Sequence, residues 1–131
     1  MITSIHTLIY SDDANATRAF LRDVLGWKHV AEEFDHTWLI FQTGPSELGV
    51  HPTRSEWEGK TCVHPRHHLI ALMCDDLEAT ITELTAKGVE FEGEVTDEGF
   101  GLVAHFTVPA AGSMMLYQPR HALAYALDDP Q

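Results

Sequence analysis

Two histidines stand at equivalent places in a repeated stretch of this chain, and their type and spacing could hold a metal ion or move a proton. His6 opens the stretch HTLIYSDD, and His68 opens the stretch HLIALMCDD. In each copy an aspartate follows the histidine by seven positions, as Asp13 and as Asp75. Neutral imidazole is a common metal ligand and a base near neutral pH. The repeated spacing indicates an internal duplication, so each copy could supply one histidine to a shared site.

Each copy also predicts the elements that would position its histidine. A short, apolar and β-branched run predicts a strand at residues 2–10 and another at residues 68–74. The aspartate pair that follows predicts a helix start, and Gly26 and Gly88 predict the two helix ends. Three more strands are expected after each helix, at residues 27–32, 36–42 and 47–52, and at residues 89–94, 102–108 and 114–118. Each copy therefore predicts a βαβββ module.

The chain of 131 residues is expected to form a single domain, because its length suits one compact core. Its parts are module one at residues 1–52, a linker at 53–66, module two at 67–119 and a C-terminal tail at 120–131. The linker is predicted because this stretch is polar, contains glycine and proline, and shows no periodicity.

Composition excludes several classes of partner. The net charge of −12, with only 8 Lys and Arg, argues against nucleic acid and against an anionic membrane surface. No apolar run approaches the length of a spanning helix, and the first residues lack the pattern of a signal peptide. Two cysteines, Cys62 and Cys74, stand in no CxxC spacing and suggest reduced thiols. We therefore expect a cytoplasmic protein with a small-molecule ligand.

The two modules resemble the vicinal oxygen chelate superfamily, which contains glyoxalase I, bleomycin-resistance proteins and extradiol dioxygenases. The resemblance covers residues 2–119 and rests on the histidine of each first strand, the aspartates at its end, and LGW or KGV after the helix. The second half, HLIALMCDDLEATITELTAKGVEF followed by LYQPRH, is similar to the small bacterial glyoxalase/bleomycin-resistance-like members. The resemblance implies an α+β fold in which two βαβββ modules form a curved mixed-sheet cup with helices on its outer face. It also implies a homodimer.

In metal-dependent members of this superfamily, the resemblance implies one ligand from the first strand and one from the last strand of each module, commonly His and Glu. His6 and His68 match the first-strand positions. Met115 stands where the second glutamate is expected, and the first falls at Leu48 or Gly49, depending on register. Two histidines and a methionine suit a hard divalent ion poorly.

Three further residues could complete such a site. Glu47 would face the same side as position 49 if that is the ligand position, and a shift of one residue reverses the faces. His51 and Gln118 each precede a proline at matching strand ends, and they are either ligands or solvated rim residues. No cofactor is expected, although a divalent metal is possible.

Residues of both modules are candidates to line the pocket. His105 points into the cup or is a hydrogen-bonded wall residue, and Trp38 stacks on a flat ligand or packs in the sheet. The candidate pocket residues are His6, Leu8, Trp38, His51, His68, Ile70, His105, Met115 and Tyr117. The first functional hypothesis is a module that binds a small molecule without a complete metal site. The alternative is a metal-dependent lyase, isomerase or dioxygenase that uses His6 and His68 as ligands.

Overall fold

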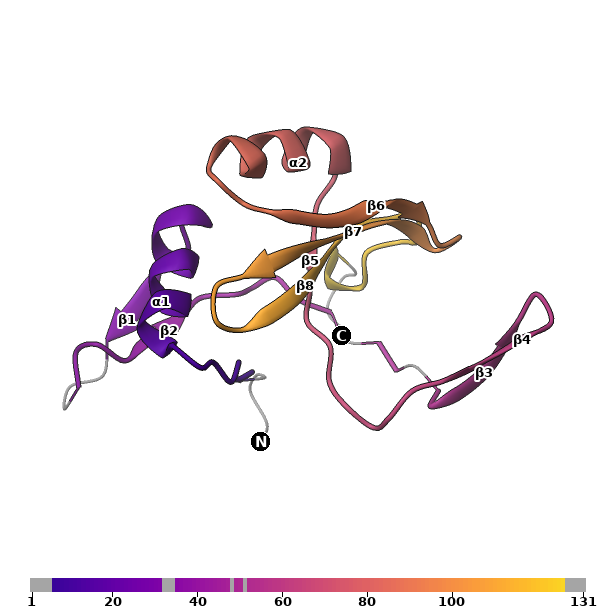
Figure 1. Ribbon diagram of the computed structural model, residues 1–131, viewed down its shortest axis with the longest axis horizontal. Coiled ribbons are helices and arrows are strands. Elements are labelled where there is room, and N and C mark those ends of the chain that lie inside the picture. The colour runs from indigo at the N-terminus through magenta and orange to yellow at the C-terminus, as the bar shows by residue number, and fades with distance from the viewer. Residues whose placement is uncertain (1–5, 32–34, 48, 51, 127–131) are drawn as a thin grey trace.

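The computed structural model describes residues 6–31, 35–47, 49–50 and 52–126, and it has the predicted α+β class (Figure 1). Module one contributes α1 (Ala14–Ala19), which continues as one π-helical turn η1 (Phe20–Val24), then β1 (His29–Ala31) and β2 (Leu39–Phe41). The hairpin β3 (Arg54–Trp57) and β4 (Lys60–Val63) follows. Module two contributes β5 (Ala71–Met73), α2 (Leu77–Ala86), β6 (Phe91–Asp97), β7 (Gly101–Val108), β8 (Gly112–Pro119) and a short 3-10 turn, η2 (Ala124–Ala126).

Module two has the βαβββ order that the sequence predicts. Its four strands form one sheet in the order β5-β8-β7-β6, in which β5 runs parallel to β8 and the other pairs are antiparallel. The side chain of Asp76 caps α2 by accepting from the backbone N–H of Ala79 at 3.1 Å. Gly88 ends this helical segment with a φ of +91°, a conformation that glycine adopts without strain.

Module one is less complete than the sequence predicts. Residues 6–10, expected to belong to the first strand, form no strand, and the rest of that prediction lies outside the described residues. The expected strand at residues 47–52 is also wrong in its described part. Only β1 and β2 pair in this module within the described residues, as a short antiparallel hairpin. Strand formation needs a partner backbone, and the sequence pattern alone does not supply one.

The predicted linker still joins the modules, but residues 54–63 are not irregular. They form the antiparallel hairpin β3–β4, whose two-residue turn has positive φ at both Glu58 (+50°) and Gly59 (+76°). Positive φ at both central residues matches the right-handed twist of the flanking strands. In Figure 1 the hairpin extends away from the sheet of module two, and β4 is exposed along its whole length.

The hydrophobic core lies between the helices and one face of the large sheet. Phe106 and Leu77 are fully buried, and Phe20 of η1 stacks on Phe106 with ring centres 6.4 Å apart. A buried hydroxyl also joins the modules, because Thr17 of α1 donates to the Pro109 carbonyl at 2.7 Å. Both helices therefore cover the same face, and the opposite face of the sheet is covered only in part, at Val103, which is 2% exposed. No helix in the described part of the chain is long and apolar enough to cross a membrane.

Candidate functional site

The open face of the module-two sheet carries the candidate site. Side chains alternate along a strand, so Phe106 and Leu116 face the helices while His105, Met115 and Tyr117 face the other way. The parallel pairing of β5 with β8 sets Ala71 opposite Met115 and Met73 opposite Tyr117. Two adjoining hollows form over this face, and Leu69 lines both of them.

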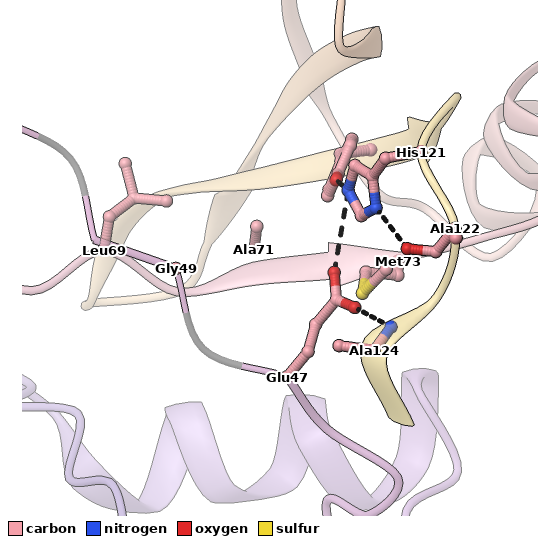
Figure 2. Close-up of a pocket in the computed structure, with 9 residues that line it drawn as sticks. Glu47, Gly49, Leu69, Ala71, Met73, His121, Ala122 and Ala124 are labelled. Atoms are coloured by element: carbon pink, nitrogen blue, oxygen red, sulfur yellow. Dashed lines mark hydrogen bonds and ion pairs between the residues drawn. The ribbon is translucent and has the colours of Figure 1, made fainter. Parts of the chain in front are cut away.

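The first hollow, here called the Glu47 pocket, lies between β5, the end of β8 and the segment that precedes the β3–β4 hairpin (Figure 2). Its volume is about 420 Å³. Its lining combines small and apolar groups with three polar side chains. The lining residues are Glu47, Gly49, Leu69, Ala71, Met73, Tyr117, His121, Ala122 and Ala124.

The second hollow, here called the His105 pocket, has the same volume of about 420 Å³. It lies over the middle of β7 and β8 and is bounded by the extended residues before α1. Its lining combines seven apolar residues with three histidines, a tyrosine and a serine. The lining residues are Leu8, Ile9, Tyr10, His67, His68, Leu69, Ile70, His105, Ala111, Ser113, Met114 and Met115.

Three polar side chains meet at one end of the Glu47 pocket. Glu47 Oε2 accepts from the backbone N–H of Ala124 at 2.9 Å, and Glu47 Oε1 lies 3.7 Å from Nε2 of His121. Nδ1 of His121 donates to the Ala122 carbonyl at 2.7 Å, and Nε2 is hydrogen bonded to the Tyr117 hydroxyl. Figure 2 shows Glu47 and His121 pointing toward each other across the opening. A carboxylate, an imidazole and a phenol therefore lie together at this end of the pocket.

Electrostatics at this end favour the neutral phenol. Burial raises the pKa of the Tyr117 hydroxyl, and the negative charge of Glu47 adds to the effect. The ring is held by an edge-to-face contact with Phe100, with centres 5.6 Å apart. Tyr117 is therefore a hydrogen-bonding group and not a phenolate. Burial likewise raises the pKa of the Cys74 thiol, with Asp75 contributing, which argues against a nucleophilic cysteine.

The comparisons with known proteins identify the family. The chain matches the model of the Glyoxalase/Bleomycin resistance protein/Dioxygenase superfamily over residues 3–123. The chain belongs to this superfamily. The resemblance seen in the sequence is thus confirmed. No match was found among proteins of curated function.

Solved structures show the shared superfamily fold. A lactoylglutathione lyase from Agrobacterium tumefaciens is 20% identical, with a TM-score of 0.58 over 88% of this chain and 92% of that chain. TnmS3, an antibiotic binding protein from Streptomyces sp. CB03234, is 21% identical, with a TM-score of 0.57 over 91% of this chain and 98% of that chain. A glyoxalase/bleomycin resistance protein/dioxygenase from Nocardioides is 15% identical, with a TM-score of 0.59 over 95% of this chain and 91% of that chain. At these identities the likeness concerns the fold alone.

The predicted pocket residues of this superfamily member divide between the two hollows. Tyr117 and the metal candidate Glu47 line the Glu47 pocket. The His105 pocket takes the larger share, namely Leu8, His68, Ile70, His105 and Met115. Ile70 also packs against the core.

Of the four other predicted site residues, three lie elsewhere. His6 lines neither hollow, and His51 lies outside the described residues. The guanidinium of Arg18 lies 4.8 Å from the ring centre of Trp38, which is in neither hollow. Gln118 Oε1 accepts from the Leu77 backbone N–H at 2.8 Å and therefore serves the first turn of α2.

The donor atoms of this chain do not fit the superfamily's divalent-metal site. Within the described residues, no three His, Cys, Asp or Glu side chains converge on one point. Met115, at the expected carboxylate position, supplies only a soft thioether. The amide oxygen of Gln118 is already used by α2. We therefore derive no chemistry through a metal.

Sequence reasoning missed His121. The residue follows Tyr117 by four positions, beyond a proline, in a stretch expected to be a tail. The chain turns back at this point, and Arg120 pairs with Asp97 through both guanidinium N–H groups at 2.5 and 2.8 Å. This pairing brings His121 to Glu47, which lies 74 positions earlier (121 − 47). No local pattern in the sequence signals a contact over that separation.

Proposed function

We propose that this protein binds a small molecule on the open face of the module-two sheet, across the Glu47 pocket and the His105 pocket. The observation that carries the proposal is the pair of adjoining hollows, each of about 420 Å³, lined mainly by apolar side chains with a few polar groups. Binding sites for small molecules commonly have this composition. TnmS3, which shares the fold, is described as an antibiotic binding protein.

The alternative is a metal-dependent lyase, isomerase or dioxygenase of the same superfamily. The observation in its favour is that three histidines, His67, His68 and His105, line the His105 pocket. The lactoylglutathione lyase that shares the fold belongs to an enzyme class. The methionine at position 115 and the lack of a converging donor set in the described residues favour the binding function.

We also propose that the protein is a homodimer in which a second copy completes the cup. Module one leaves residues 6–10 without a pairing strand in the described part, and Tyr10 at the edge of the His105 pocket is 88% exposed. The β3–β4 hairpin and the residues after it carry Arg54, Lys60 and Arg66, three of the 8 Lys and Arg of a chain with net charge −12. The arm, meaning the β3–β4 hairpin, also carries Glu56 and Glu58, so residues 54–66 have a net charge of +1 (3 − 2), which still opposes the acidic remainder of another copy.

We place the dimer in the cytoplasm. The two cysteines support this proposal, because both are free and Cys62 is exposed on the arm. Alkylation in denaturant, immediately after release without reductant, would label both thiols if the compartment is reducing, since burial protects Cys74 in the native fold. A disulfide-linked dimer on a non-reducing gel would contradict it.

Elemental analysis of untagged protein, followed by thermal unfolding with and without Ni²⁺, Zn²⁺, Mn²⁺ and Fe²⁺, separates the two functions. Binding without a metal predicts substoichiometric metal and no shift of the unfolding midpoint. The enzyme predicts near-stoichiometric metal and a midpoint increase that is lost when His6 and His68 are both changed to alanine. The second result would overturn the proposed function.

A further inference from the structure

We propose that the polar end of the Glu47 pocket selects ligands that carry a cationic nitrogen, such as an ammonium or amidinium group. The inference rests on the proposed function and names the class of ligand that the site accepts. Its basis is the number of donor hydrogens that Glu47, Tyr117 and His121 carry and the hydrogen bonds that already use them.

The imidazole of His121 carries its hydrogen on Nδ1. Nδ1 of His121 lies 2.7 Å from the Ala122 carbonyl oxygen, which can only accept. Nδ1 therefore carries the hydrogen, and in the neutral ring Nε2 is left with a lone pair. The Tyr117 hydroxyl is bonded to that nitrogen, so it donates its hydrogen to Nε2.

Apart from that bond, the side chains of Tyr117 and Glu47 offer only lone pairs. Tyr117 has used its only hydrogen, and its oxygen keeps lone pairs that can accept. Glu47 Oε2 accepts from the Ala124 N–H, whereas Oε1 lies 3.7 Å from the lone pair of His121 Nε2, beyond hydrogen-bond distance. The side chains at the polar end thus present several acceptors and no spare donor. A ligand with N–H groups supplies the missing donor, and a positively charged nitrogen supplies the strongest one.

The surroundings favour the same class of ligand. The carboxylate of Glu47 is only 16% exposed, so its charge is screened less than a surface charge would be. Leu69, Ala71 and Met73 provide an apolar wall for the body of the ligand, as Figure 2 shows. The net charge of −12 raises the local concentration of cations.

Three probes with one carbon skeleton test this class of ligand. We would measure the binding of 4-phenylbutylamine, 4-phenylbutanol and 4-phenylbutanoate by calorimetry at neutral pH, using the full chain. The amine is expected to bind at least about tenfold more tightly than the alcohol, because it makes charge-assisted hydrogen bonds. The carboxylate is expected to bind more weakly than the alcohol, since it adds another acceptor and a like charge.

Glu47→Gln is the decisive variant. Its amide oxygen can still accept from Ala124, while its NH₂ group fills the donor deficit from within the protein. The preference for amine over alcohol should therefore fall by about tenfold, with the affinity for the alcohol unchanged. Tyr117→Phe, which keeps the ring and removes the oxygen, should lower the same preference. Glu94→Gln removes one charge from an exposed position on β6 and should leave the preference unchanged.

The outcomes distinguish this inference from the function on which it rests. Equal affinity for the amine and the alcohol, or a preference that survives both Glu47→Gln and Tyr117→Phe, overturns the ligand class and leaves small-molecule binding intact. Equal loss of preference in Glu94→Gln would assign the effect to net charge and also overturn the site. Failure of all three probes to bind would overturn the proposed function together with the inference.

Discussion

At the scale of single residues, chemical type alone did not decide which candidates serve the site. Glu47 and Gln118 looked similar in the sequence, as oxygen donors near strand ends. Glu47 now lines a pocket, whereas the amide oxygen of Gln118 accepts from the first turn of α2. The difference arises from which backbone N–H groups lie nearby, and only the folded chain determines that.

Gln118 is therefore expected to act through the stability of α2. Gln118→Leu removes the acceptor for the Leu77 N–H and should lower the free energy of unfolding by about 1 kcal/mol, the usual cost of a lost helix cap. Gln118→Glu keeps an acceptor at a helix N-terminus and should be at least as stable as the native chain. Urea unfolding measures both changes. Equal destabilisation by the two variants would show that packing, and not the hydrogen bond, matters at this position.

Asp97 is expected to make stability depend on pH in the acidic range. Its ion pair with Arg120 lowers the pKa of the carboxyl from 3.8 to about 2. Because the folded-state pKa is the lower one, the stabilisation is present above the unfolded value and is lost as pH falls from about 4 toward 2. Asp97→Asn should therefore lower the thermal midpoint at neutral pH, and its deficit relative to the native chain should shrink through this window. A deficit that stays constant with pH would contradict the ion pair.

At the scale of elements, module two could be predicted well and module one only in part. In module two the strand, helix and three strands follow the sequence pattern, and Asp76 and Gly88 bound the helical segment as expected. In module one the alternation at residues 6–10 suits a pleated surface, yet no strand pairs with it in the described part of the chain. The β3–β4 hairpin was missed because its turn, Glu58-Gly59, lacks the asparagine or aspartate that usually signals positive φ.

The buried hydroxyl of Thr17 is expected to contribute to the attachment of α1 to module two, beside the packing of Phe20 and the hydrogen bond from the Asp12 N–H to the Ala110 carbonyl. Thr17 is 4% exposed and donates to the Pro109 carbonyl at the turn between β7 and β8. Thr17→Val keeps the shape and leaves that carbonyl without this donor, so the free energy of unfolding should fall by about 1–3 kcal/mol.

Thr82→Val on α2 is the matched control. Its exposed hydroxyl only bonds the preceding turn of its own helix, at Glu78. This change should alter the free energy of unfolding by less than about 0.5 kcal/mol. Equal effects of the two valine substitutions in urea unfolding would mean that Thr17 does not join the modules.

At the scale of the whole molecule, the open face of the sheet and the extended β3–β4 hairpin both indicate that this chain alone does not enclose the two hollows. Both helices cover one face of the large sheet, so the hollows on the other face are bounded by this chain on only part of their rim. The resemblance to the superfamily implied a cup made of two halves. The folded chain instead completes one half and holds a hairpin away from it (Figure 1). In the proposed dimer a second copy closes the open face, and the duplication within the sequence does not reveal how the two halves pair.

Removal of the arm is therefore expected to separate the proposed dimer without unfolding the chain. The N–H of His64 donates to the Thr53 carbonyl at 2.8 Å, so the two ends of the hairpin are adjacent and a Gly-Gly turn can replace residues 54–63. Among the residues whose burial the structure describes, none of the arm belongs to the core, so the thermal midpoint of the shortened monomer should change little. Sedimentation should shift from twice the mass of the 14.6 kDa chain to a monomer. A paired substitution, Arg54→Glu with Lys60→Glu, should weaken the dimer in the same direction, because residues 54–63 also carry Glu56 and Glu58 and would become as acidic as the rest of the chain. A shortened chain that remains dimeric would place the interface elsewhere, and the hairpin would then have to be explained by a role other than joining two copies.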